Sequence, residues 1–214
     1  MEGDLLRFGL TALVTLLVLV DPFGLVPIFV TLTAGCSKKE RAALLGRAVR
    51  VAFGVSVLFL AAGRVVLAYL GVTVNAFAIS GGVLLFAAAL QMLFGQRTGL
   101  QSSEPREGSP GDDISVFPLA IPLLSGPGTL TAILLLTSQA RGNPWRVAIL
   151  FAALVVVFVT TWIVLRAGEL LMERIGEGGA HVATRVMGIV LAALAVQFVL
   201  NGTTGYYQSL SRGN

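Results

Sequence analysis

The sequence predicts an all-α membrane protein, and three observations carry that prediction. Of 214 residues, 56% are hydrophobic and only 12% are charged, against roughly 25% charged residues in an ordinary soluble domain. The charges are clustered, and apolar stretches between the clusters reach the length of about 20 residues that a helix needs to cross a bilayer. These stretches do not alternate with a period of two, so helices rather than strands of a closed barrel are expected.

Six membrane-spanning helices are expected. The second contains Arg64, which fits if it lies near one end of the span, where its long side chain can reach the interface. The approximate bounds of the six spans are 8–33, 46–70, 75–95, 115–138, 145–168 and 181–202.

Residues 95–114 interrupt this pattern with Gly, Ser, Pro and mixed charges. Such a composition predicts a flexible linker, here on the cytoplasmic side. The linker separates a first three-helix repeat, 1–94, from a second, 115–202, and residues 203–214 form a tail.

The two halves resemble each other at a nearly constant offset. The matching positions are Gly24 with Gly128, Gly71 with Gly176, Gly82 with Gly188, and Gln91 with Gln197. Because three spans is an odd number, the second repeat must be inverted in the membrane. Inverted repeats are characteristic of secondary transporters, whose binding site lies near the midplane where the repeats meet.

Proline and glycine cluster inside the first and fourth spans, at 21–27 and 118–128. These residues remove helical hydrogen bonds, so both helices should be broken there. Each break would expose the N-terminus of a half-helix, which suits an anion such as a carboxylate. The candidate substrate-binding residues are Asp21, Pro22, Phe23, Gly24, Ser125, Gly126, Pro127, Gly128 and Thr129.

Asp21 is the only acidic residue in the interior of a span. Two interpretations stay open: an acceptor that caps the amides around Gly24, or a ligand for a substrate ammonium, a proton or another cation. Interhelical hydrogen bonds are expected from these uncharged polar residues inside the spans: Asn75, Ser80, Gln91, Thr160, Thr161, Gln197 and Asn201. The matched positions of Gln91 and Gln197 make these two candidates for an outer layer of the site.

Other classes of protein fit less well. The net charge is +4 and the pI is about 9.8, but the basic residues lie at the ends of apolar stretches, which argues against nucleic-acid binding. No phosphate-binding G-x-x-x-x-G-K-[ST] motif is present, so a primary pump is disfavoured. An intramembrane hydrolase could use Ser80 or Ser125, but His181 is the only histidine and is expected near the cytoplasmic end. No enzymatic activity, metal site or cofactor is therefore expected.

Three motifs resemble those of the MarC family of membrane proteins. They are Asp21-Pro22-Phe23-Gly24-x-x-Pro27, Ile79-x-Gly81-Gly82-x-Leu84-Leu85-Phe86-x-x-Ala89-Leu90-x-Met92-Leu93, and Phe117-Pro118-Leu119-Ala120-Ile121-Pro122-Leu123-Leu124-x-Gly126-Pro127-Gly128. The resemblance implies a six-span bacterial inner membrane protein and, from some relatives, transport of small neutral amino acids such as glycine and alanine. The alternatives are an exporter or channel for another small polar metabolite, or a scaffold for another subunit. Candidate coupling ions are H+ and Na+, and a homo-oligomer is an open alternative.

The distribution of basic residues generates a prediction about topology. Ten of the fifteen Lys and Arg residues fall on one side of the six-span arrangement, and the positive-inside rule makes that side cytoplasmic. Reporter fusions at residues 40, 104 and 178 should therefore report the cytoplasm. Fusions at 72, 142 and 214 should report the outside. A cytoplasmic C-terminus would contradict both the span count and the inverted repeat.

Overall fold

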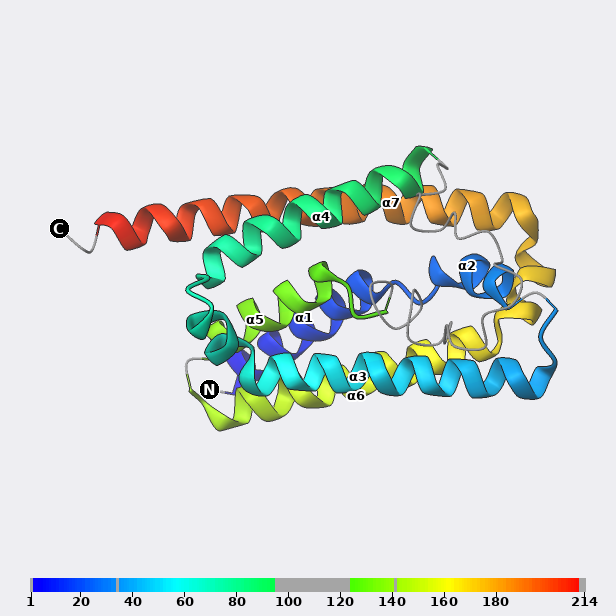
Figure 1. Cartoon of the computed structure of the whole chain (residues 1–214), viewed down its shortest axis with the longest axis horizontal. Helices are drawn as coiled ribbons and strands as arrows, with labels where there is room; N and C mark the ends of the chain where they lie inside the picture. Colours follow the sequence, from blue (N-terminus) through cyan, green and yellow to red (C-terminus); the bar gives the residue numbers. More distant parts are fainter. Residues whose placement is uncertain (1, 34, 95–123, 141, 212–214) are drawn as a thin grey trace.

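The computed structural model describes residues 2–33, 35–94, 124–140 and 142–211, and every regular element in these ranges is an α-helix (Figure 1). The helices are α1 (Glu2–Val20), α2 (Leu25–Leu32), α3 (Lys38–Tyr69), α4 (Val74–Phe94), α5 (Pro127–Gln139), α6 (Pro144–Arg166) and α7 (Gly168–Ser211). The all-helical prediction is confirmed for this part of the chain.

Five helices of the described ranges are long and apolar enough to cross a membrane: α1, α3, α4, α6 and α7. The other two, α2 and α5, have 8 and 13 residues and span only about 12 and 20 Å at 1.5 Å per residue. The expected linker 95–114 and the first part of the expected fourth span, 115–123, lie outside the described residues.

Four of the long helices form two antiparallel pairs around α1 and the two short helices (Figure 1). α4 packs along α7, and α3 packs along α6. Between the pairs, α1 and α5 contact each other in the half of the molecule that holds both ends of the chain, and α2 lies in the other half. Both short helices therefore begin near the middle of the molecule and run toward opposite ends.

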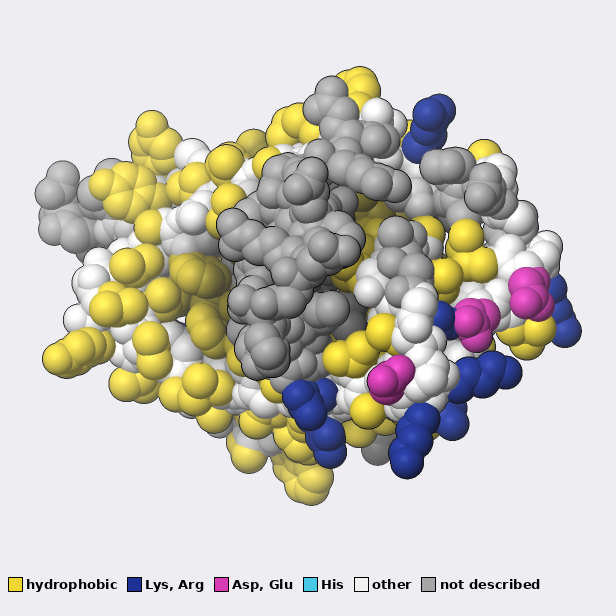
Figure 2. Space-filling view, turned by 45° about the vertical axis from the view of Figure 1, so that its right-hand side comes forward, with side chains coloured by type: hydrophobic (Ala, Val, Ile, Leu, Met, Phe, Trp, Pro, Cys, Tyr) yellow, Lys and Arg dark blue, Asp and Glu magenta, His cyan; other side chains and the backbone are white. Residues whose placement is uncertain are grey.

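The outer surface is apolar in the way that a surface facing lipid must be. Large hydrophobic side chains such as Leu58, Val65 and Ile163 are more than half exposed along α3 and α6. Two strongly exposed aromatic residues lie at helix ends, Tyr69 at the end of α3 and Trp145 at the start of α6, as is usual at a membrane interface. Charged side chains gather on the right-hand side of the view in Figure 2, whereas hydrophobic ones dominate the left.

Two arginines form hydrogen bonds at the C-terminal ends of the short helices. Arg41, in α3, donates to the carbonyl oxygen of Thr33 at the end of α2, at 3.1 Å. Arg146, in α6, donates to the carbonyl oxygen of Gln139 at the end of α5, at 3.0 Å. Each guanidinium also forms an ion pair with a carboxylate on another helix: Arg41 with Glu169, and Arg146 with Asp4. The carbonyl groups that helix ends leave unpaired are thus satisfied by a cation, the charge that a helix C-terminus prefers.

α7 is longer than the expected sixth span and changes direction near its start. Gly176 has φ 68° and ψ 169°, which is not helical, and glycine takes this conformation without a steric penalty. The apolar part of the helix covers Thr184–Ser209, so helix continues through most of the segment 203–214 that the sequence assigned to a tail.

α4 and α7 approach closely because glycines line their contact. A Cβ atom on Gly82 of α4 would lie 2.7 Å from the carbonyl oxygen of Ala195 in α7. A Cβ atom on Gly188 of α7 would lie 3.1 Å from the carbonyl oxygen of Ala89 in α4. Small residues permit this backbone approach in membranes, where packing rather than water exclusion holds helices together.

Gly82→Val should separate α4 from α7 and lower the free energy of unfolding by roughly 1–3 kcal/mol, because the new side chain meets backbone that cannot rotate away. Thermal unfolding in detergent would measure the change. Gly54→Ala in α3 is the matched control, since its Cβ would meet nothing within 4 Å. Equal stability of the two variants would contradict the close contact.

Candidate functional site

The first expected break is present between α1 and α2, and Asp21 shapes it. Asp21 has φ 46°, a left-handed conformation that non-glycine residues rarely adopt. Its Oδ1 accepts a hydrogen bond from the Gly24 amide at 3.0 Å, so the side chain caps the start of α2. Gly24 must be small, because a Cβ there would lie 2.1 Å from Asp21 Oδ2. The capping interpretation of Asp21 is thus confirmed by this hydrogen bond.

The cap uses only half of the carboxyl group. Asp21 is 5% exposed, and its second oxygen, Oδ2, is buried without a hydrogen-bond partner among the described residues. A buried carboxylate oxygen left unpaired is costly. This atom is therefore available to a donor or a cation, and the two interpretations of Asp21 are compatible in one side chain.

The second break precedes α5 and differs from the first in how the following helix is capped. Gly126 is the N-cap residue, and no side chain among the described residues caps the helix. Pro127 occupies the first turn, where its missing N–H costs nothing, and Gly128 and Thr129 follow it as buried residues. The first amides of α5 thus lack the side-chain acceptor that Asp21 supplies to α2. An uncapped helix N-terminus in a buried setting favours an anion.

The two breaks lie side by side. A Cβ on Gly128 would be 3.4 Å from Leu19 Cδ2, and Leu19 is two residues before Asp21. Leu85 of α4 covers the same glycine, 3.0 Å from that position. The space beside the α5 N-terminus is therefore narrow and bounded by two leucines.

A third polar element, which sequence reasoning missed, lies beside the second break. The Oγ atoms of Ser56 in α3 and Ser125 are hydrogen bonded at 3.1 Å. Both residues are almost fully buried. Ser56 stands in an uncharged stretch among small and apolar residues, so no local motif distinguished it. Its position gains meaning only from the packing of α3 against the break.

Several polar side chains are buried, some of them at the breaks. In the described ranges the buried polar or charged residues are Asp21, Thr33, Ser56, Ser125, Thr129, Thr131 and Thr161. Thr131 Oγ1, like Asp21 Oδ2, is buried without a hydrogen-bond partner among the described residues. The Thr161 hydroxyl donates to the carbonyl oxygen of Val157, one turn earlier in α6, at 2.8 Å. No group of three or more His, Cys, Asp or Glu residues that could hold a metal occurs in the described part of the chain.

The remaining candidate residues are spread more widely. Pro22 is buried, but Phe23 is about half exposed. Gln91 is half-buried in α4. Gln197 lies on the exposed side of α7 and donates to Asn201 Oδ1 at 2.8 Å. The structure thus brings Leu19, two residues before Asp21, against Gly128 and leaves Phe23 and Gln197 at the surface.

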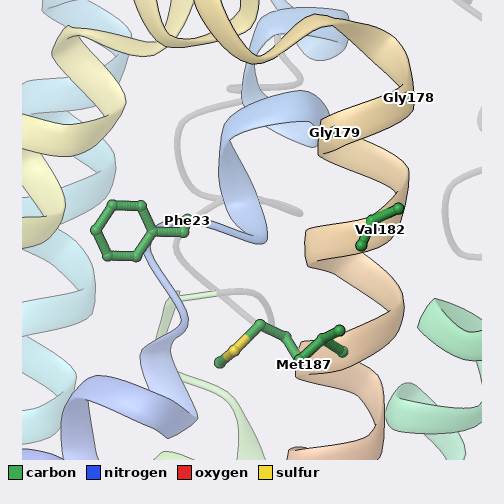
Figure 3. A pocket seen from close by; sticks show the side chains of 6 residues that line it. Phe23, Gly178, Gly179, Val182 and Met187 are labelled. Carbon is green, nitrogen blue, oxygen red and sulfur yellow. The ribbon is translucent and has the colours of Figure 1, made fainter.

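A groove next to the first break differs in chemistry from the breaks themselves. Phe23 lies on one side of it and α7 on the other, where Val182, Val186 and Met187 line it (Figure 3). Its volume is about 570 Å³. Hydrophobic side chains dominate this lining, so the groove offers little to a charged ligand.

These features define a multi-pass, all-helical membrane protein with two helix breaks gathered at a buried polar centre. The family model described as "MarC family integral membrane protein" matches residues 6–207. The chain therefore belongs to the MarC family.

Curated relatives agree with this assignment. The chain is 34% identical to the UPF0056 membrane protein MJ1677 of Methanocaldococcus jannaschii, over 94% of this chain and 98% of the relative. It is also 34% identical to the UPF0056 inner membrane protein YhgN of Escherichia coli K12, over 90% and 94% of the two chains. No solved structure matches the chain.

Gly24→Ala should break the cap of α2, because the methyl group displaces the Asp21 carboxylate from the Gly24 amide. The expected loss in free energy of unfolding is about 0.5–2 kcal/mol, the usual cost of losing a cap. Thermal unfolding would measure it. Gly46→Ala in α3, where a Cβ meets nothing within 4 Å, is the control, and a Gly24→Ala protein as stable as this control would refute the cap.

Proposed function

We propose that this protein is a secondary transporter of small neutral amino acids, glycine- or alanine-like zwitterions, with its site between the two helix breaks. Two features together carry the proposal. Asp21 has one buried oxygen without a partner among the described residues, and the N-terminus of α5 has no capping side chain among them. One feature suits an ammonium group and the other suits a carboxylate. The leucines around Gly128 favour a ligand with little or no side chain.

The proposal includes six spans arranged as two inverted repeats, and the packing supports this. Gly63 of α3 faces Leu134 of α5 at 2.7 Å, and Gly168 of α7 faces Val30 of α2 at 3.4 Å, measured from the Cβ that each glycine lacks. Adding 105 to Gly63 gives Gly168, and adding 104 to Val30 gives Leu134. The two contacts are therefore equivalent under the offset found in the sequence.

The contact between α4 and α7 supports the same relation between the two repeats. Gly82 lies against the carbonyl of Ala195, and Gly188 lies against the carbonyl of Ala89. Gly188 follows Gly82 by 106 residues, and Ala195 follows Ala89 by the same number. Arg41 and Arg146, 105 residues apart, bond to the ends of the two short helices in the same way. Such reciprocal contacts favour a pseudo-two-fold axis in the membrane plane, the arrangement of many secondary transporters.

The proposed location is the inner membrane of a bacterium, with both termini outside the cytoplasm. Support comes from the basic residues that begin α3, Lys38, Lys39 and Arg41, at the end of the molecule opposite both termini. A gradient of H+ or Na+ would drive transport, and no cofactor or enzymatic step is involved. Homo-oligomers are compatible with the proposal.

A channel or an exporter for another small polar metabolite is the alternative. A channel equilibrates its substrate, whereas a coupled transporter accumulates it against a gradient. Purified protein in liposomes, with an imposed H+ or Na+ gradient and radiolabelled glycine or alanine, separates the two. Accumulation above the outside concentration supports the transporter, and equilibration alone would favour the channel.

Asp21→Asn should lower gradient-driven glycine uptake at least about tenfold while the protein stays folded. The amide oxygen can still accept from Gly24, so the cap survives, but the charge that would receive an ammonium or a coupling cation is lost. Uptake by reconstituted protein is the measurement.

Asp4→Asn is the matched control for this experiment. Asp4 is an exposed aspartate whose ion pair with Arg146 lies at the periphery, so glycine uptake should stay close to wild type. Normal uptake by the Asp21→Asn protein, with unchanged dependence on pH and cations, would make Asp21 purely structural.

A further inference from the structure

The bond between Ser56 and Ser125 is one half of a larger arrangement. It joins α3 to the residue before the α5 break, 69 residues away, within the buried interior. The inverted repeat of the proposed function, on which this inference rests, requires an equivalent pair between α6 and the break before α2.

The buried faces of α3 and α6 identify the equivalent pair. Five buried positions of α3 correspond to five buried positions of α6 at an offset of 105: Leu45 with Leu150, Ala48 with Ala153, Ala52 with Val157, Ser56 with Thr161, and Leu60 with Leu165. At the breaks the offset of 104 relates Asp21 to Ser125. Applied to the Ser56–Ser125 pair, these two offsets give Thr161 and Asp21 as the equivalent pair in the other repeat.

The two pairs have opposite hydrogen-bonding character. Thr161 uses its only hydrogen on the carbonyl of Val157, so its oxygen has only lone pairs to offer. Asp21 Oδ2 is likewise an acceptor without a partner. In the equivalent pair both atoms are acceptors, so only a donor placed between them can join them, and an ammonium group has three N–H bonds.

The serine pair leaves a donor free instead. When one of two hydroxyls donates to the other, the hydrogen of the accepting hydroxyl remains available. Ser125 lies directly before Gly126, the N-cap of α5, which no described side chain caps, so the spare hydrogen of the serine pair adds a donor near the first amides of α5. Together they suit a carboxylate, whereas Asp21 already caps the N-terminus of α2.

We propose that Ser56 and Thr161 are substrate-binding residues that fix the orientation of a zwitterion. Thr161 Oγ1 and Asp21 Oδ2 receive the ammonium group. The Ser56–Ser125 pair and the first amides of α5 receive the carboxylate. A small amino acid thereby spans the two breaks in one direction only.

Glycine binding to purified protein in nanodiscs, measured by isothermal titration calorimetry, tests the proposal. Thr161→Val keeps the shape and removes the hydroxyl, and should raise the Kd for glycine about tenfold or more, since bonds to charged groups are the stronger class. Ser56→Ala should do the same. Thr161→Ser restores the oxygen and should bring the Kd back to within about threefold of wild type.

Thr33→Val is the matched control. Thr33 is a buried threonine whose hydroxyl donates to the carbonyl of Phe29, one turn earlier, at 2.8 Å, as Thr161 does to Val157. Its removal should leave the Kd for glycine unchanged, and thermal unfolding of both valine variants should confirm comparable folding.

The possible outcomes distinguish failure of this inference from failure of the proposed transport function. Failure of the wild-type protein to bind glycine or alanine overturns both. Wild-type binding with a Thr161→Val Kd equal to that of Thr33→Val overturns the role of Thr161 and leaves the transporter intact. A raised Kd that Thr161→Ser does not restore assigns the effect to packing and also overturns the proposal.

Discussion

The hydrogen bond between the Gly24 amide and Asp21 Oδ1 is the interaction on which the centre of the molecule depends. A chain that stops being helical inside an apolar medium leaves amides and carbonyls that lipid cannot satisfy. Asp21 resolves part of this by supplying an acceptor from its own side chain, in a backbone conformation that allows the chain to restart as α2. The same carboxylate is then buried, and its second oxygen is left without a hydrogen-bond partner among the described residues.

The surrounding helices hold this centre by close packing rather than by charge. Gly82 and Gly188 bring the backbones of α4 and α7 together, and Gly63 admits Leu134 of α5. The ion pairs of Arg41 with Glu169 and of Arg146 with Asp4 lie near helix ends. This division follows from the solvent, because ion pairs are affordable near the interface and small residues are what permits tight contact in hydrocarbon.

The proposed inverted repeat accounts both for the positions that match between the two halves and for the pair that differs at the breaks. Equivalent positions carry similar residues where they only pack, as in Leu45 and Leu150. They differ at the breaks, where an aspartate corresponds to a serine. A symmetric pair of aspartates would place two like charges in one small cavity, and a symmetric pair of serines would offer no charge to an ammonium group. The unlike pair suits a ligand whose two ends are also unlike.

The sequence by itself determined the helical class, the membrane setting and the position of the first break, because hydropathy, Pro and Gly act locally along the chain. It also placed Asp21 and Gly128 among the candidates, since both are conspicuous in their own segments. Only the tertiary structure decided that Ser56 meets Ser125, that Gln197 points outward and bonds to Asn201, and that α7 continues past residue 203. These depend on which helix faces pack together, and a contact between residues 69 positions apart leaves no local trace in composition or periodicity.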